Sequence, residues 1–409
     1  MKFITLILLL LLAACGVQAQ EPTLAPEPLP LVGDGISFVP ELQRPVLIER
    51  PEPEPEPVFP NEVGEIMIIV YHGLHPENPG PFDRLTADFK NDLQALYDGG
   101  FRLISMRDLI NNNITTPAGY TPVVLSFDDG LPSAFSLKQA EDGSLVPVPG
   151  TAVYILNEFY KQNPDFGRTA IFFINGSPRP FAGAGTLQER FEFLIDHGFE
   201  LGNHAYSHPN FATLNARRLQ QEIGRVDQLI RRYAPAYEPL VIAYPFGIRP
   251  RPALRHYVMA GEYGGEAYSH AWALRVGNTF VPAVPYHVNF DPTNVARVVP
   301  SDQSTPYYNV VDLGFLLRRF EQFPHLRFIS DGDPATITVP STHVHYLNMY
   351  SLGDKELVVY EIYETYDIYI ETDYEAEEDY EIEAAYEAEA AYESEAAFPF
   401  SSIQMDLAG

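Results

Sequence analysis

The sequence predicts an α/β fold built around a parallel sheet, either open or closed. Short apolar runs rich in β-branched residues alternate with longer segments whose apolar residues recur at the spacing of one helix face. Such repeated strand–helix units imply parallel strands, because each helix returns the chain to the start of the next strand. The stretch from about residue 66 to 339 has the length of one large α/β domain.

The expected elements follow one another in a regular order. Residues 65–71 form an almost unbroken apolar run, typical of a buried strand, and residues 86–99 form a helix that a glycine pair ends. The remaining expected elements are strands at 101–105, 122–127, 169–174, 198–202 and 241–244, and helices at 106–111 and 214–233. In folds of this kind the chemistry gathers at the carboxyl ends of strands.

The first residues predict a lipid anchor. An apolar run over residues 3–12 is too short to cross a bilayer and fits the core of a signal peptide. It ends in Leu12-Ala13-Ala14-Cys15-Gly16, which resembles the lipobox of bacterial lipoproteins, where cleavage precedes a cysteine that is then lipidated. Cys15 is the only cysteine, so no disulfide forms within the chain. We expect a lipoprotein signal peptide over 1–14 and a chain held by Cys15 on the outer side of a bacterial cytoplasmic membrane; an ordinary secretory signal is the alternative.

Two low-complexity segments flank the expected folded domain. Residues 15–61 are rich in proline and glutamate and predict an extended tether, and residues 62–353 form the expected catalytic domain. Residues 354–409 form an acidic, tyrosine-rich tail in which only residues 358–374 could pair as strands. Between positions 356 and 406 there are 17 acidic residues and no basic one, so the tail carries over half of the net charge of −29. A charge this negative argues against nucleic acid as a partner.

Two adjacent carboxylates stand at the end of one expected strand. The strand at 122–127 runs directly into Asp128, Asp129 and Gly130. Side chains of neighbouring residues diverge, so one carboxylate can bind a metal ion while the other faces a water molecule. Taken alone, the Asp-Asp-Gly string is also typical of an ordinary turn.

Two histidines follow another expected strand. His204 and His208 are four residues apart and can converge on one cation if the segment makes a helical turn. Two imidazoles and one carboxylate are a recurring ligand set for catalytic zinc, and Asp129 could complete it. A third segment, residues 243–247, closes a further strand with a Pro-Phe-Gly turn, which is also compatible with a simple corner.

The order and spacing of these motifs resemble the polysaccharide deacetylases of carbohydrate esterase family 4, the group with the NodB homology domain. Residues 126–130 resemble the family's Thr-Phe-Asp-Asp-Gly motif, and residues 204–208 resemble its His-Ser/Thr-x-x-His motif. The similarity extends from about Met67 to the region of Pro300. It implies a distorted (β/α) barrel and an enzyme that removes acetyl groups from sugars.

The resemblance also implies roles for individual residues. Asp129, His204 and His208 would hold a divalent metal ion, with zinc as the expected element. Asp128 would be the catalytic base, and the backbone N–H of Phe246 would help to stabilise the oxyanion.

The sequence departs from the family pattern in its third motif. Ala243 stands where the motif usually carries an arginine, and Arg249 is a candidate to replace that cation.

A clear Leu-x-His motif, which supplies the acid in many family members, is also missing. The run Ile69-Val70-Tyr71-His72-Gly73 instead resembles the motif that opens the permuted branch of exopolysaccharide deacetylases, whose acid is this early histidine. We therefore expect His72 to be the acid, with His270, His287 and His325 as weaker candidates.

These expectations combine into a metal-dependent hydrolase of an N-acetylated cell-envelope or extracellular polysaccharide. A metal-activated water would attack, Asp128 would accept its proton, and His72 would protonate the departing amine. Two alternatives remain open: an esterase of O-acetylated xylan or another glycan, and a catalytically dead carbohydrate-binding lipoprotein. Four aromatic residues near the motifs are candidates both for stacking on sugar rings and for the core: Tyr71, Tyr206, Phe211 and Tyr244.

Overall fold

A computed structural model describes residues 57–80, 82–276, 284–300 and 312–362. The expected signal peptide, Cys15, most of the tether and the tail from residue 363 lie outside these ranges, so they stay predictions. In the described part, no helix has the length and apolar character needed to cross a membrane.

Seven parallel strands form a barrel. Their order in the sheet is β1 (Met67–Tyr71), β5 (Thr121–Phe127), β8 (Ile171–Ile174), β10 (Glu200–Asn203), β11 (Val241–Ala243), β14 (Trp272–Val276) and β15 (Val295–Arg297). β4 (Phe101–Leu103) pairs with the start of β5. The ring closes beyond β15, where Val298 exchanges two 2.8 Å backbone hydrogen bonds with Ile68 and Val70 of β1. The prediction of a distorted (β/α) barrel is therefore confirmed.

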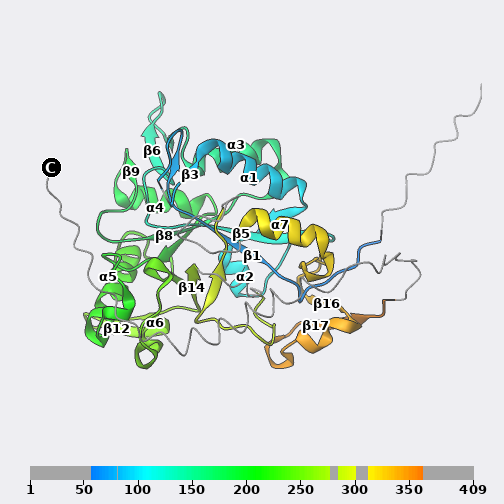
Figure 1. Cartoon of the computed structure of the whole chain (residues 1–409). Coiled ribbons are helices and arrows are strands. Elements are labelled where there is room, and N and C mark those ends of the chain that lie inside the picture. The colour runs from blue at the N-terminus through cyan, green and yellow to red at the C-terminus, as the bar shows by residue number, and fades with distance from the viewer. Residues whose placement is uncertain (1–56, 81, 277–283, 301–311, 363–409) are drawn as a thin grey trace, which may run out of the picture. The chain divides into compact units, whose positions relative to one another are not determined.

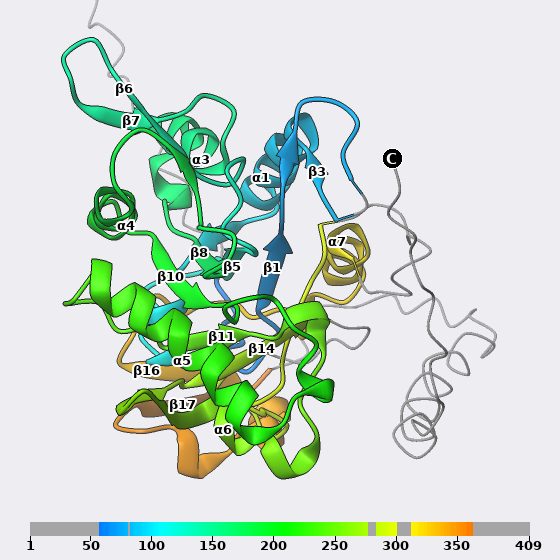
Figure 2. The same cartoon turned by 90° about the vertical axis from the view of Figure 1, so that its left-hand side faces the viewer.

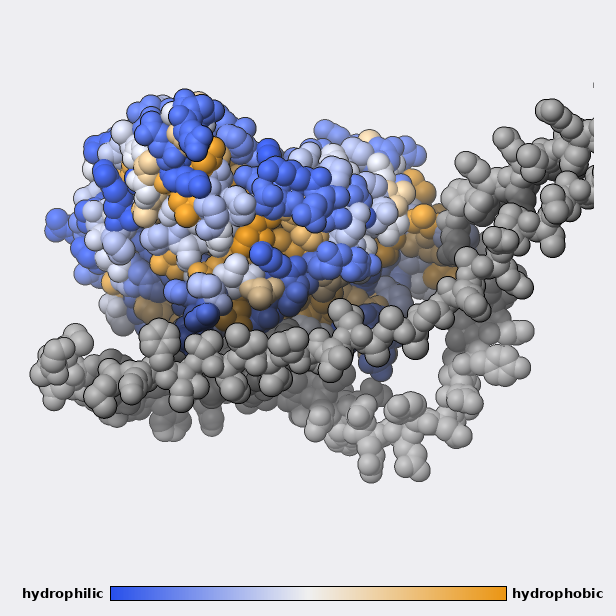
Figure 3. All heavy atoms as spheres, turned by 90° about the horizontal axis from the view of Figure 1, so that it is seen from above, coloured by the Kyte–Doolittle hydropathy of each residue, from blue (hydrophilic) through white to orange (hydrophobic). Residues whose placement is uncertain are grey.

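Helices surround this barrel, as Figures 1 and 2 show for α1, α3, α4, α5 and α7. The α-helices are α1 (Thr86–Asp98), α2 (Met106–Ile110), α3 (Ala152–Gln162), α4 (Leu187–Asp196), α5 (Ala216–Tyr233), α6 (His256–Met259) and α7 (Leu313–Gln322). In α5 the residues that recur every three or four positions, such as Leu219, Ile223 and Ile230, are buried, and the Asn215 side chain caps the first turn. Seen from above, the surface is mostly hydrophilic, with apolar residues gathered in small patches (Figure 3).

Short elements decorate the barrel. The strands are β2 (Leu74–His75), β3 (Arg84–Leu85), β6 (Ser136–Gln139), β7 (Leu145–Pro147), β9 (Ala182–Gly183), β12 (Ala260–Tyr263), β13 (Glu266–Ser269), β16 (Thr336–Pro340) and β17 (Glu356–Tyr360). The 3₁₀ helices are Pro164–Phe166, Phe211–Thr213, Pro245–Gly247, Pro252–Leu254, Pro324–Leu326, Ser341–Tyr346 and Met349–Ser351. The loop that holds β2 and β3 contributes Phe82 and Asp83 to a cavity at the carboxyl ends of the barrel strands.

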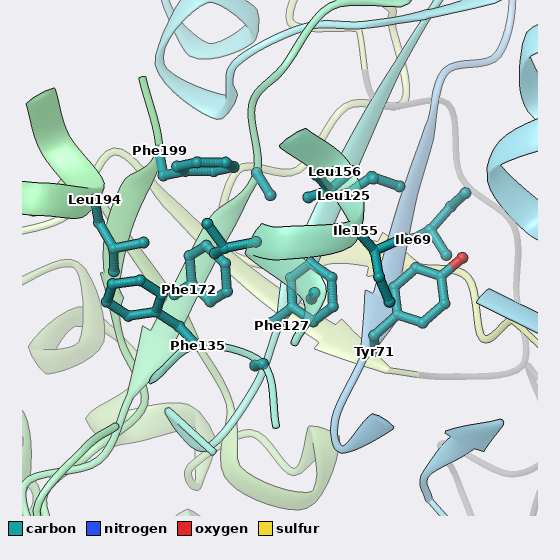
Figure 4. Close-up of a cluster of buried hydrophobic side chains, with 14 of the residues drawn as sticks. Ile69, Tyr71, Leu125, Phe127, Phe135, Ile155, Leu156, Phe172, Leu194 and Phe199 are labelled. Atoms are coloured by element: carbon teal, nitrogen blue, oxygen red, sulfur yellow. The ribbon is translucent and has the colours of Figure 1, made fainter. Parts of the chain in front are cut away.

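An aromatic row forms the centre of the main core. The Tyr71 ring stacks on Phe127 with centroids 5.4 Å apart, and Phe127 stacks on Phe172 at 5.1 Å (Figure 4). All three side chains are buried. Tyr71 is therefore a core residue, and the row fixes the ends of β1 and β5, from which His72 and the two aspartates emerge.

The ordered structure continues beyond residue 353, where the sequence analysis placed the end of the catalytic domain. β17 lies in the segment expected to open the acidic tail, yet it pairs in parallel with β16 over five residues. β17 contains the short apolar run Leu357-Val358-Val359, a signal that the acidic composition of the segment conceals.

Candidate active site

All six predicted site residues line one cavity of about 470 Å³ at the carboxyl ends of the barrel strands. They are His72 after β1, Asp128 and Asp129 after β5, His204 and His208 after β10, and Phe246 after β11. These residues are far apart in sequence, but parallel strands bring their carboxyl ends to the same face of the barrel.

Asp129, His204 and His208 form a cluster suited to one metal ion. Asp129 Oδ1 lies 3.6 Å from the Nε2 atoms of both histidines, and the three ligand atoms lie within 4.8 Å of one another. His204 Nδ1 is 2.9 Å from the carbonyl oxygen of Ala243, which assigns the proton to Nδ1 and leaves the Nε2 lone pair for a ligand bond. Among the described residues, no other cluster of three such side chains meets this spacing.

The electrostatics of the cluster suit metal binding. Burial lowers the pKa of His204 to about 4 and also lowers that of His208, so both imidazoles are neutral near pH 7. Burial, followed by the charge of Asp128, raises the pKa of Asp129 to about 6. Two neutral imidazoles and a carboxylate fit the donor set that zinc takes in catalytic sites, so the residues present fit the implied cofactor.

Four residues of the site have a left-handed backbone conformation, which residues other than glycine seldom adopt. The φ angles are 70° at Asp129, 58° at Ala205, 51° at His208 and 60° at Phe246. Such conformations persist only where the surrounding structure imposes them, and they cluster at functional sites.

Buried groups of α5 hold the histidine loop in this shape. Asn203 accepts the N–H of Ala205 at 2.9 Å and donates to the carboxylate of Asp227 at 2.6 Å. The carboxylate of Glu222 accepts the N–H of Ser207 at 2.7 Å. The loop therefore takes its conformation from a polar network beneath it, which fixes the direction of the two imidazoles.

Asp128 is a buried carboxylate in a bidentate ion pair. Arg297 of β15 donates from Nη1 and Nη2 to the two carboxylate oxygens at 2.6 and 2.7 Å. Burial alone would raise the pKa of Asp128, but the Arg297 charge, helped by His204, holds it well below the usual range. Asp128 Oδ2 also lies 3.6 Å from His204 Nε2, so the ionised carboxylate borders the metal cluster.

Arg297, and not Arg249, provides the cation beside Asp128. Arg249 donates to the Thr293 hydroxyl at 3.2 Å and lies 3.9 Å from the carboxylate of Asp291, outside the residues that line the cavity. The proposed replacement by Arg249 is therefore wrong. Sequence reasoning missed Arg297, although a lone arginine within the apolar run of residues 295–299 is a signal for a buried, paired cation.

His72 occupies the position expected of an acid. Its side chain is 21% exposed, lines the cavity, and places Nε2 at 3.9 Å from Asp128 Oδ2. The weaker candidates His270, His287 and His325 are not among the residues that line this cavity. His270 is buried between the Val258 carbonyl and Asp227, which gives it a structural role.

The Phe246 backbone is available as a hydrogen-bond donor. The next two N–H groups, of Gly247 and Ile248, close the turn by bonding to Tyr244 and Pro245. No acceptor for the Phe246 N–H is found in the described parts of the chain.

The four aromatic candidates for sugar stacking belong mainly to the interior. Tyr71, Phe211 and Tyr244 are buried, and the hydroxyl of Tyr244 donates to the Thr293 carbonyl. Tyr206 is partly buried and is covered by the guanidinium of Arg225 at 3.3 Å from its ring centroid. The exposed aromatic residues at the cavity are instead Phe82 and Phe246.

Comparisons with known proteins show what the central part of the chain is similar to. Residues 116–261 match the family model described as polysaccharide deacetylase. A peptidoglycan-N-acetylglucosamine deacetylase of Bacillus cereus is 24% identical over 170 residues, which are 42% of this chain and 52% of that protein. The chain thus spans about half the length of the curated relative it matches.

Solved structures with a similar arrangement include two bacterial proteins. The Streptococcus pyogenes deacetylase PplD in complex with acetate has 16% identity and a TM-score of 0.44, covering 62% of this chain and 97% of that one. IcaB from Ammonifex degensii has 18% identity and a TM-score of 0.42, covering 60% and 95%.

Proposed function

Because this chain carries a domain of the polysaccharide deacetylases, a family of hydrolases, we propose that it removes acetyl groups from an N-acetylated polysaccharide with the help of a divalent metal ion. One observation carries the proposal: the Asp129, His204 and His208 cluster lies beside the ion-paired Asp128 in a single cavity. A binding module needs neither a metal-ligand set nor a buried ionised carboxylate next to it.

Asp129, His204 and His208 would hold the metal ion. When bound there, a zinc ion supplies Lewis acidity toward the acetyl carbonyl and increases the acidity of water. The Nδ1 hydrogen bond of His204 to the Ala243 carbonyl keeps its Nε2 turned toward the cluster.

Asp128 is the proposed base. Its carboxylate stays ionised at physiological pH, since Arg297 holds its pKa low, and it can accept the proton of the attacking water. Arg297 binds both carboxylate oxygens and so fixes the orientation of the group. The free N–H of Phe246 would donate to the oxyanion that develops on the acetyl oxygen.

His72 is the proposed acid. As the C–N bond breaks, the sugar nitrogen must gain a proton, and His72 lines the same cavity with its Nε2 near Asp128. The products are acetate and a free amino sugar. The alternative of a dead site rested on the missing arginine at position 243, and Arg297 removes that argument.

The His72 assignment predicts a difference between amide and ester substrates. An amine leaving group needs protonation far more than a phenol does, so His72→Ala should lower acetate release from N-acetylglucosamine oligomers by about 10²–10⁴-fold. Hydrolysis of p-nitrophenyl acetate should fall much less.

Acetate release by the purified full chain tests both the function and this role. O-acetylated xylan is assayed in parallel, and His325→Ala serves as the control, since His325 is exposed and is not among the residues that line the cavity. Release from xylan alone would favour the esterase alternative. Undiminished amide cleavage by His72→Ala would show that another group is the acid.

The proposed place of action is the outer side of a bacterial cytoplasmic membrane. Support comes from the lipobox-like residues 12–16 and the single cysteine at position 15. If Cys15 carries the lipid, a Cys15→Ser variant should no longer be found in the membrane fraction after cell fractionation. A variant that remains in the membrane fraction would contradict the anchor.

A further inference from the structure

A buried polar chain connects the histidine loop to a histidine that the proposed chemistry does not use. Asn203, which precedes the ligand His204, bonds to Asp227 of α5, and Asp227 Oδ1 lies 3.2 Å from Nε2 of His270. The side chains of Asp227 and His270 are 1% and 0% exposed. α5 lies beside α6, whose Val258 contacts the other nitrogen of the His270 ring (Figures 1 and 2). Backbone groups at both ends of this chain determine the direction of each hydrogen bond in it.

The backbone fixes the orientation of the Asn203 amide. Its Oδ1 accepts the N–H of Ala205 at 2.9 Å, and a backbone N–H can only donate. Its Nδ2 donates to the carbonyl of Ile223 at 2.9 Å, and a carbonyl can only accept. Nδ2 therefore also donates to Asp227 Oδ1, at 2.6 Å. So short a contact is typical of a charged acceptor, which makes Asp227 a carboxylate.

His270 then carries a proton on each ring nitrogen. Nδ1 lies 2.7 Å from the carbonyl oxygen of Val258, so Nδ1 is a donor. Nε2 faces the carboxylate oxygen of Asp227, which also accepts, so Nε2 is a donor as well. An imidazole with two donors is an imidazolium, and its positive charge offsets the buried negative charge of Asp227.

The other groups around this pair do not replace His270. Arg231 is 30% exposed and lies 3.7 Å from Asp227 Oδ2, too far for a hydrogen bond. The Tyr268 ring lies 5.8 Å from the His270 ring, and its hydroxyl donates to the Tyr257 carbonyl. Burial, followed by the charge of Asp227, raises the pKa of Tyr268, so this phenol stays neutral. Among the described residues, His270 is therefore the only cation within hydrogen-bond distance of Asp227.

The other end of the chain is the strained backbone that presents the metal ligands. Ala205, between the two ligand histidines, has a φ of 58°, a conformation that persists only where its surroundings impose it. The N–H of Ala205 is held by Asn203 Oδ1, and that oxygen faces it while Nδ2 is bound to Asp227. Without the charge of His270, Asp227 would be a buried carboxylate with no bonded cation, and the amide would lose a fixed partner.

We propose that His270 is a buried imidazolium that positions the ligand histidines His204 and His208 through Asp227 and Asn203. It is a positioning residue, since it is not part of the cavity lining and acts by keeping Asp227 ionised and oriented. This inference rests on the proposed metal-dependent function and names a residue on which the affinity of that site for its metal ion depends.

Two measurements on the full chain test this role. The first is ¹⁵N NMR of protein labelled at its 11 histidines. The ring signals that are absent from His270→Gln belong to this residue, and they should show a hydrogen on both nitrogens at pH 7. The second is the affinity for zinc, measured by competition with a chelator, which should fall about tenfold in His270→Gln. A neutral His270 ring, or an unchanged zinc affinity, would overturn the inference.

A loss of stability must be separated from a loss of positioning. Glu65→Gln is the matched control, because Glu65 forms a partly buried ion pair with Arg319 of α7, outside the cavity. This variant should lower the midpoint of thermal unfolding and keep the zinc affinity. If it weakens zinc binding as much as His270→Gln does, the effect of His270 is one of general stability and the inference is wrong.

A double variant tests whether His270 and Asp227 act as a unit. Each single change leaves one buried ion without its partner, whereas His270→Gln combined with Asp227→Asn leaves neither. The double variant should therefore lose less zinc affinity than the product of the two single losses. Losses that simply multiply would contradict the proposed coupling.

A wild type that binds no zinc would instead overturn the proposed metal-dependent function. The ring signals of the two ligand histidines then judge the positioning. It stands only if those signals move in His270→Gln and stay in place in Glu65→Gln.

Discussion

Replacing Asp128 with asparagine should reduce acetate release from N-acetylglucosamine oligomers by about 10²–10⁴-fold. The amide has nearly the shape of the carboxylate but cannot accept a proton from the attacking water. The three metal ligands are separate side chains, so the variant should still bind one metal ion. This combination of lost turnover and retained metal distinguishes a base from a ligand.

A loss of folding must be separated from this loss of chemistry. In Asp128→Asn, Arg297 is left buried without its anionic partner, which costs about 3–5 kcal/mol when a buried pair is broken. Asp92→Asn is the matched control, because Arg84 and Asp92 form another largely buried pair, at 2.6 Å and outside the cavity. Asp92→Asn should lose stability and keep kcat. An active Asp128→Asn variant would contradict the assignment of the base.

Removing the other half of the pair should be nearly as damaging. In Arg297→Met, Asp128 loses the two hydrogen bonds that orient it and is left as a buried unpaired carboxylate, so kcat should fall by more than about tenfold and stability by about 3–5 kcal/mol. Arg297→Lys keeps the charge but not the bidentate geometry, and should recover activity only in part. Chemical denaturation and acetate release measure the two effects.

A variant with both partners replaced separates the cost of a buried unpaired charge from the loss of a correctly oriented base. Asp128→Asn combined with Arg297→Met contains no buried unpaired ion, so it should be more stable than Arg297→Met alone while remaining inactive. Arg249→Met should keep activity within a few-fold, since Arg249 contacts Thr293 and Asp291. If Arg249→Met is the more damaging single change, the assignment of Arg297 as the cation of the site is contradicted.

The sequence predicted the parts of the site that local patterns encode. Asp128 and Asp129 follow an apolar run, and His204 and His208 follow another expected strand; in a parallel α/β fold the ends of such strands converge. The long helix α5 could also be predicted from the sequence, because its apolar residues recur with the helical period over 18 residues.

Features that depend on contacts between distant segments could not be predicted from the sequence. Arg297 lies 169 residues from Asp128 and belongs to a strand of three residues, too short to show a period. The carboxylate of Asp83 accepts hydrogen bonds from Gly73 and Gly80, which no sequence pattern displays. β17 was assigned to the tail because acidic composition outweighed a run of three apolar residues, which forms a strand by pairing with β16.

The central claim is that Asp129, His204 and His208 hold a metal ion on which Asp128 depends for its chemistry. The most direct measurement is the zinc bound per full chain after chelation and readdition, taken together with acetate release from the same sample. We expect one zinc and activity for the wild type, one zinc without activity for Asp128→Asn, and neither for Asp129→Ala. Full activity of the zinc-free wild type, or an unchanged zinc content in Asp129→Ala, would contradict the account.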